Sequence, residues 1–164
     1  MQEISTGKIM RNGEVVMLDL GCMFEGHHSD LARSVLVGSD PATPEQKAAY
    51  GAAKSALDAM VAQIKPGANS GRIEQAARNA ISEAGFADHA YTYFPGHGIE
   101  MSPWEPPIVD AGATDELQAG MVICVEPGVH KPGVCGLRLE ETVMVTDTGA
   151  AVLAKTEFWR ALLE

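Results

Sequence analysis

The sequence has few cysteines, a shortage of positive charge and no long apolar run, and each shortage excludes a class of protein. Its three cysteines are odd in number and lack Cys-x-x-Cys spacing, which indicates a reduced, cytoplasmic protein without a disulfide framework. Twelve lysines and arginines against 22 acidic residues give a net charge of −10, which argues against a nucleic-acid or anionic-membrane partner. No apolar run approaches the ~18 residues of a membrane span, and the N-terminal residues lack a signal-peptide pattern.

The length and composition are those of an ordinary globular domain. The 164 residues are enough for one hydrophobic core, and we expect a single domain over residues 1–164. The hydrophobic share of 46% and the charged share of 21% are both unremarkable for such a domain. Residues 1–14 read as the approach to a strand, so we expect the chain to lack the N-terminal part of a longer protein.

Capping and apolar patterns predict two consecutive helices in the middle of the chain. Thr43 is placed to cap a helix and forms a capping box with Gln46, and apolar residues recur at helical spacing to about residue 64. Ser70 is placed to cap a second helix, which ends at Gly85.

Strands are predicted over residues 14–20, 30–37, 121–127, 136–146 and 150–154. The first of them is apolar and β-branched, which is typical of a buried strand. Residues 88–107 are rich in proline and are predicted to form a loop, and an amphipathic tail over 157–164 closes the chain. The predicted order of hairpin, two helices, long loop and hairpin is typical of an α+β fold in which helices pack on one face of a curved antiparallel sheet.

Two stretches are predicted to form β-hairpins, and each carries two acidic residues at positions that should lie opposite each other. Opposed residues of a regular hairpin are equidistant from its turn, so Asp19 and Asp30 should face each other across a turn centred on residues 24–25. Glu126 and Glu140 should likewise face each other across a Lys-Pro-Gly turn. Opposed Cβ atoms lie about 4.5–5.5 Å apart, so each hairpin sets two mutually repelling carboxylates side by side. Two such pairs in one small domain predict a bound cation.

A fifth candidate ligand is His97, in the sequence Phe-Pro-Gly-His-Gly-Ile. The flanking glycines allow the unusual backbone angles that a ligand-presenting loop needs. Four carboxylates and one imidazole suit a pair of divalent metal ions such as Mn, Co, Zn or Fe. Two such ions about 3.5–4 Å apart hold a water or hydroxide and polarise a carbonyl, which is the usual arrangement for amide hydrolysis.

Each candidate ligand also has a structural interpretation. Asp30 could begin a strand or pair with Arg33, and a histidine such as His97 is often a surface residue or a satisfied core residue. Aspartate is disfavoured in strands, so Asp19 would need a partner in any structural role. Glu126 interrupts an apolar run, and a buried acid must be paired, protonated or bound to metal.

Neighbouring polar residues compete with these candidates. Glu140 is followed by Glu141, whose side chain should point to the opposite face of the strand, and the hairpin symmetry selects Glu140. Arg138 shares the face of Glu140 and is expected to pair with an acid. His27 and His28 diverge if they lie in a strand, and we interpret them as structural or supporting groups, although either could reach substrate or metal.

Five motifs in this order resemble the metal site of the pita-bread metallopeptidases. They are LDLG, HSDLARS, PGHGIE, VEPGV and GLRLEETVMVT, and the resemblance covers about residues 13–153. That family includes methionine aminopeptidase, Xaa-Pro aminopeptidase and prolidase, and also creatinase, an ectoine hydrolase and a dimethylsulfoniopropionate lyase. The resemblance implies the pita-bread fold, here truncated at its N-terminal end.

The resemblance also implies a division of labour among the five candidate ligands. Asp19 would be bidentate on one metal, Asp30 and Glu140 would bridge both metals, and His97 and Glu126 would complete the other shell. Glu126 would in addition be catalytic, carrying a proton from the metal-bound water to the leaving amine. A metal-bridged hydroxide would be the nucleophile that attacks a small peptide or amide.

Departures from the family pattern concern groups beside the metal ligands. In the peptidases the segment commonly continues Gly-His-Gly-Ile-Gly and then supplies a second histidine that helps to hold the substrate carbonyl. Here Glu100 stands where glycine is usual, and Trp104 stands at the place of that histidine. The histidine that the peptidases carry before the first hairpin is also missing. Trp104 could bind substrate, by lining a pocket or by contacting a cationic group, or it could simply pack within its loop.

Three functions are compatible with these motifs. The first is a cytoplasmic dinuclear metallohydrolase that resembles Xaa-Pro dipeptidase or aminopeptidase. The second is a relative that keeps the metals but has changed its chemistry, such as an ectoine-type hydrolase or a sulfonium lyase. The third is an inactive truncated domain that binds a partner. Without the helices of the N-terminal half, apolar sheet surface should be exposed, and a homodimer, common in the family, would cover it.

Overall fold

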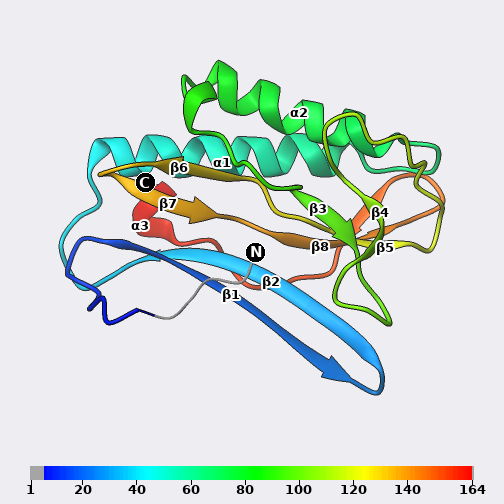
Figure 1. Ribbon diagram of the computed structural model, residues 1–164, viewed down its shortest axis with the longest axis horizontal. Coiled ribbons are helices and arrows are strands. Elements are labelled where there is room, and N and C mark those ends of the chain that lie inside the picture. The colour runs from blue at the N-terminus through cyan, green and yellow to red at the C-terminus, as the bar shows by residue number, and fades with distance from the viewer. Residues whose placement is uncertain (1–5, 164) are drawn as a thin grey trace.

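The computed structural model describes residues 6–163 and shows a helical layer packed against antiparallel strands (Figure 1). The helices are α1 (Pro44–Gln63), α2 (Ser70–Glu83), α3 (Arg160–Leu163) and the 3₁₀ turn η1 (Ala87–His89). The strands are β1 (Val15–Phe24), β2 (His27–Leu36), β3 (Gly96–Gly98), β4 (Glu105–Ile108), β5 (Val122–Val125), β6 (Gly128–Lys131), β7 (Cys135–Arg138), β8 (Glu141–Val145) and β9 (Ala150–Val152). A five-stranded sheet has the order β4-β3-β5-β8-β9, and β1-β2 and β6-β7 form two-stranded sheets.

Both predicted helices are present, and the first begins as its sequence predicts. The Thr43 hydroxyl accepts a hydrogen bond from the Gln46 amide at 3.2 Å, and the Gln46 side chain accepts one from the Thr43 amide at 2.9 Å. The predicted cap of the second helix was wrong by one residue. Asn69 caps α2 by accepting a hydrogen bond from the Arg72 amide at 3.1 Å, because Asn69 keeps an extended backbone while Ser70 is already helical.

The core lies between α1 and the sheet. α1 packs against β5, β6 and β7 on one side and against α2 on the other, and Figure 1 shows both helices on the same face of the strands. Side chains from both layers are fully buried there, among them Leu57, Met60, Ile73, Ile123 and Leu137. Within the described residues no helix is both long and apolar enough to cross a membrane.

The register of the first hairpin differs from the prediction by two residues. Asp19 lies opposite Ala32, and Asp30 lies opposite Gly21. The turn consists of Glu25 and Gly26, which both have positive φ, and such a two-residue turn fixes the register. Because the difference is an even number of residues, both aspartates still project from the same face of the sheet.

The prediction that the first strand is buried was wrong. One face of β1 carries alternating apolar side chains, and Leu18, Leu20 and Phe24 are 46%, 71% and 73% exposed. The strand lies at the edge of the molecule away from α1 and α2 (Figure 1), and no part of the described chain covers that face. We call the side chains of Leu18, Leu20 and Phe24 the bare face.

The second hairpin has the predicted register, but its strands are interrupted. Gly128 lies opposite Arg138 and Val125 lies opposite Glu141, which centres the turn on Gly133. The predicted strand over 136–146 divides into β7 and β8, whereas 121–127 contains only β5, because β6 begins beyond its predicted end, at Gly128. The breaks fall at residues 126–127 and 139–140, so Glu126 and Glu140 lie beside the breaks and not within a ladder.

The prediction of a loop over residues 88–107 was wrong in part, because the segment contains β3 and the start of β4. β3 pairs with β4 on one side and β5 on the other. A Cβ atom at Gly96 would lie 2.6 Å from the Cys124 carbonyl oxygen, and one at Gly98 would lie 2.5 Å from the Pro106 carbonyl oxygen. The glycines that flank His97 therefore permit close strand packing, not unusual backbone angles. A strand of three residues is too short to show periodicity.

Candidate metal centre

The structure brings all five predicted ligands to one place, from five separate parts of the chain. Asp19 comes from β1, Asp30 from β2, His97 from β3, Glu126 from the residue after β5 and Glu140 from the residue before β8. One carboxylate oxygen from each of Asp19, Asp30 and Glu140 lies within 4.8 Å of the others. His97 Nε2 lies 3.9 Å from Asp30 Oδ2 and 3.5 Å from Glu126 Oε1.

Two of these side chains are buried with unsatisfied atoms. Glu140 is 1% exposed and His97 is 0% exposed. Neither carboxylate oxygen of Glu140, nor His97 Nε2, has a hydrogen-bond partner among residues 6–163. His97 Nδ1 donates to the Gly98 carbonyl at 3.0 Å, which leaves Nε2 facing the acids and available to bind a cation when the ring is neutral. Buried orphan atoms are costly, and a cation at this position would satisfy all three.

The electrostatics of the cluster are repulsive. Burial, followed by the charges of Asp19 and Glu126, raises the pKa of Asp30 to about 6. Burial, followed by the charges of Asp30 and Glu126, raises the pKa of Glu140 to about 9. Burial lowers the pKa of His97, but the contacts with Glu126 and Gly98 outweigh burial and the net shift is upward. The donor set of four carboxylates and one imidazole fits divalent cations, whose charge would remove this repulsion.

Arg138 supplies positive charge at one side of the cluster. Its Nη1 atom lies 2.7 Å from Asp19 Oδ2 and 2.7 Å from Glu126 Oε2, which confirms the predicted pairing with acids. Its guanidinium stacks on the Tyr93 ring at 4.3 Å, and its Nε donates to the Tyr93 hydroxyl. Sequence reasoning did not identify Tyr93, because an aromatic residue four positions before His97 carries no pattern of its own.

The two hairpins meet along a seam between β2 and residues 138–142. The hydrogen bonds that cross it include those from Thr142 Oγ1 to the Asp30 carbonyl (2.7 Å), from the Glu140 amide to the Ala32 carbonyl (3.2 Å) and from the Arg138 amide to Ser34 Oγ (3.0 Å). The spacing of these contacts is that of an antiparallel pair of strands. The seam therefore sets the separation of Asp30 and Glu140.

The competing polar residues lie outside the cluster. Arg33 pairs with Glu141 at 2.9 Å and not with Asp30, and Glu141 points away from Glu140 as strand alternation predicts. His28 Nδ1 lies 3.1 Å from the Glu100 carbonyl at the end of the first hairpin, and His27 lies beside the Glu100 side chain. Neither histidine belongs to the group of acids that converge in the described structure.

Trp104 lies at the mouth of the candidate site. Its ring meets His97 edge to face with centroids 6.4 Å apart, and the residue is 53% exposed. A cleft lined by Trp104, Met17 and Pro103 reaches Asp19 and Asp30. An apolar surface therefore adjoins the carboxylates and remains open to solvent.

The sequence is similar to a metallopeptidase family model and to individual peptidases. Residues 2–147 match the family model of metallopeptidase family M24. The Xaa-Pro dipeptidase of Pyrococcus horikoshii is 33% identical over 154 residues, which cover 94% of this chain and 43% of the dipeptidase. An uncharacterised peptidase of Staphylococcus saprophyticus is 39% identical over 145 residues, which cover 85% of this chain and 39% of that protein.

Solved structures are similar over the same region. The prolidase of Pyrococcus horikoshii superposes with a TM-score of 0.87 at 33% identity, over 93% of this chain and 43% of the prolidase. A dipeptidase of Mycobacterium ulcerans gives a TM-score of 0.87 at 32% identity, over 94% of this chain and 41% of the dipeptidase. These similarities confirm the predicted pita-bread fold. The chain spans about two fifths of the length of the curated relatives that it matches.

Proposed function

The chain belongs to metallopeptidase family M24, and on this premise we propose that it is a dinuclear metal-dependent hydrolase. Asp19, Asp30, His97, Glu126 and Glu140 would hold two divalent ions. The observation that carries this proposal is the group of orphan atoms on buried Glu140 and His97. They face a cluster of acids whose cationic partner in the described chain, the half-buried Arg138, pairs with Asp19 and Glu126. Mn, Co, Zn and Fe all suit this donor set.

The proposed reaction is hydrolysis of a small peptide or amide, with an Xaa-Pro dipeptide as the first substrate to test. Bound divalent ions supply charge that polarises a carbonyl and lowers the pKa of the attacking water. Glu126 would accept the proton of that water and give it to the leaving amine. Arg138 holds Glu126 Oε2 at 2.7 Å, so Glu126 Oε1, on the side of His97, is the oxygen available for this transfer.

Trp104 is proposed to contact the substrate at the mouth of the site. Its exposed ring and the neighbouring Met17 and Pro103 form an apolar border beside the carboxylates. A proline ring or a cationic group would find favourable contacts there. The oligomeric state that suits the bare face is a homodimer, and the compartment that suits the composition is the cytoplasm.

A second candidate function is a family relative with changed chemistry, such as an ectoine-type hydrolase or a sulfonium lyase. The observation that favours it is Trp104 itself, which occupies the place of the histidine that holds the substrate carbonyl in the peptidases. A third candidate is a binding domain without activity, which the exposed bare face favours.

Activity assays on protein loaded with Mn²⁺ or Co²⁺ separate these candidates. Release of proline from Xaa-Pro dipeptides, with loss of turnover in Glu126→Gln, supports the peptidase. Turnover of an ectoine-like amide or of a sulfonium compound alone supports the second candidate. Metal binding without any turnover supports the third, and a wild-type chain that binds no divalent ion contradicts both enzymatic candidates.

A further inference from the structure

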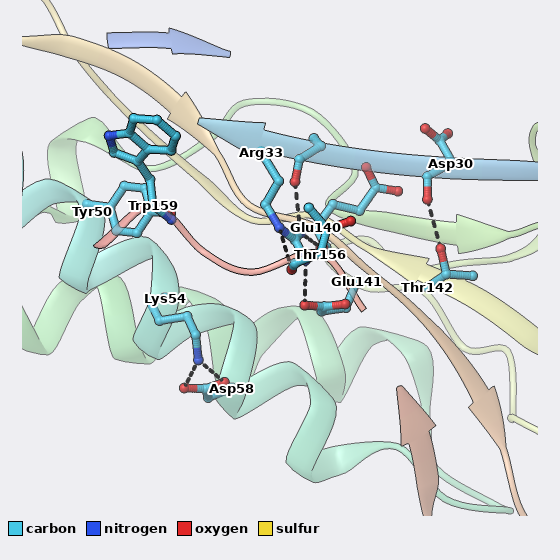
Figure 2. A network of polar contacts seen from close by, with 11 residues as sticks. Asp30, Arg33, Tyr50, Lys54, Asp58, Glu140, Glu141, Thr142, Thr156 and Trp159 are labelled. Carbon is cyan, nitrogen blue, oxygen red and sulfur yellow. Dashed lines mark hydrogen bonds and ion pairs between the residues drawn. The ribbon is translucent and has the colours of Figure 1, made fainter. Parts of the chain in front are cut away.

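Arg33 lies behind the candidate metal centre, three residues after Asp30 on β2, and is 7% exposed (Figure 2). A guanidinium has five N–H donors, and buried donors need partners. All five are engaged: Nε and Nη2 donate to the Thr156 carbonyl, Nη2 also to Glu141 Oε1, and Nη1 to the carbonyls of Ala32 and Glu140. Arg33 is therefore fixed in one position.

The partners of Arg33 Nη1 lie on opposite sides of the seam. Ala32 is on β2 with Asp30, and Glu140 comes from the second hairpin. The Ala32 carbonyl also accepts the Glu140 amide at 3.2 Å, so the peptide groups on both sides of Glu140 are attached to β2. Rotation or retreat of Glu140 from Asp30 would break these contacts.

The far side of Arg33 is held by residues 153–163, which we call the C-terminal strap. The Thr156 carbonyl accepts from Arg33 Nη2 at 2.8 Å, and the guanidinium stacks on the Phe158 ring at 4.3 Å. The Trp159 amide donates to the buried Tyr50 hydroxyl of α1 at 3.0 Å, which ties the strap to the helical layer (Figure 2). The strap lies beyond residue 147, where the match to the family model ends.

We propose that Arg33 is a positioning residue of the metal centre, and that the C-terminal strap holds it there. By binding the backbone across the seam, Arg33 sets the separation at which Asp30 and Glu140 can share cations. This inference rests on the proposed metal site and extends it to residues that contact no metal. Groups that orient metal ligands commonly change affinity by about 10- to 100-fold when they are altered.

The matched control is a second Arg–Glu pair far from the seam. Arg78 pairs with Glu74 on α2 and stacks on the Tyr91 ring at 4.7 Å, and Glu74 is 1% exposed. Both side chains of the Arg33–Glu141 pair are buried, whereas in the control pair Glu74 is buried and the Arg78 side chain is 39% exposed. Replacing both partners with apolar residues leaves no unpaired charge in either case, and for a buried pair it is often neutral for stability. The test variant is therefore Arg33→Met with Glu141→Leu, and the control is Arg78→Met with Glu74→Leu.

The test compares Mn²⁺ binding to the full chain by titration calorimetry, together with the electron paramagnetic resonance signal of a coupled Mn²⁺ pair. Wild type and the Arg78/Glu74 control should bind two ions and give the coupled signal. The Arg33/Glu141 variant should bind at least one ion 10- to 100-fold more weakly, with a diminished coupled signal. Unfolding in chelator should be cooperative for all three proteins.

If the Arg33/Glu141 variant does not fold, Arg33→Lys is measured in the same way. Lysine keeps the charge beside Glu141, but its single ammonium cannot reach the Glu140 and Thr156 carbonyls together. Affinity within twofold of wild type, in whichever variant folds, overturns the role of Arg33 and leaves the metal site intact. An equal loss in the Arg78/Glu74 control also overturns it. A wild-type chain that binds no Mn²⁺ overturns the metal site and this inference together.

Discussion

The two hairpins deliver two acids each to the same place, but only one of them is covered by helices. α1 packs against β5, β6 and β7, whereas the bare face of β1 is open to solvent. The acids differ accordingly, because the side chains of Asp19 and Asp30 are 33% and 19% exposed and that of Glu126 is 7% exposed. The helical layer thus does more than stabilise the sheet, because it also makes the acids of the second hairpin dependent on a counter-charge.

The largest expected difference between the hairpins is at Glu140. Glu140→Gln should lower metal affinity at least 100-fold, yet it should stabilise the chelated protein by about 2 kcal/mol or more at pH 8, because Glu140, whose pKa is about 9 in the folded chain, must take up a proton on folding at this pH and glutamine need not. Asp19→Asn should also weaken metal binding but should not stabilise the chelated protein, because Asp19 is paired with Arg138. Metal titration and urea unfolding in chelator measure both quantities. Equal stabilisation by the two substitutions would contradict the proposed difference between unpaired Glu140 and paired Asp19.

The hairpins should differ nearly as much in how far their apolar side chains contribute to the free energy of unfolding. Ile123 on β5 is fully buried, so Ile123→Ala should cost about 2–5 kcal/mol in the free energy of unfolding. Leu20 on the bare face is 71% exposed, so Leu20→Ala should change that free energy by less than about 0.5 kcal/mol. Urea unfolding of the chelated proteins gives both values. A large cost at Leu20 would mean that the bare face is covered in solution.

The pH dependence of the free energy of unfolding should show the effect of burying Glu140. The pKa of Glu140 is raised from 4.5 to about 9 in the folded chain, so the folded state binds the proton more tightly than the unfolded state. Stability of the chelated protein should therefore be highest below pH 4.5 with respect to this group, and should fall as pH rises through 9. Glu140→Gln should flatten the slope between these limits. A wild-type stability that rises over this range would contradict the assignment.

The smallest expected effect concerns the bare face. If two copies of the chain associate there, Leu20→Ser with Phe24→Ser should weaken the association about tenfold or more and leave metal affinity unchanged. Sedimentation velocity over a range of concentrations measures this association, and Met144→Ser, at an exposed position on β8, is the control. A wild-type chain that stays monomeric at high concentration would remove the homodimer prediction.

The sequence predicted the helical half of the fold better than the first hairpin. Capping residues and helical spacing are local signals, so α1 and α2 are found within about a residue of their predicted limits. The register of β1 and β2 depends on a Glu25-Gly26 turn, and glutamate is an uncommon residue at positive φ. Burial of β1 could not be read from its apolar sequence, because burial depends on what packs against the strand.

The candidate site could be located from the sequence, but the residues that hold its side chains in position could not. Acids at hairpin positions and a glycine-flanked histidine are visible as patterns, and the structure brings their side chains together. The contacts of Arg33 with Thr156 and of Arg138 with Tyr93 join residues that are far apart in the chain, and they leave no periodic signal. The roles of the five side chains as metal ligands stay a prediction.

The most direct test of the central claim is anomalous diffraction from crystals of the chain grown with Mn²⁺. We expect two anomalous peaks, both contacted by carboxylates of Asp19, Asp30 or Glu140, with one also near His97 Nε2 and Glu126. Crystals in which these side chains converge but carry no Mn²⁺ at saturating concentration, or in which Mn²⁺ binds elsewhere, would contradict it.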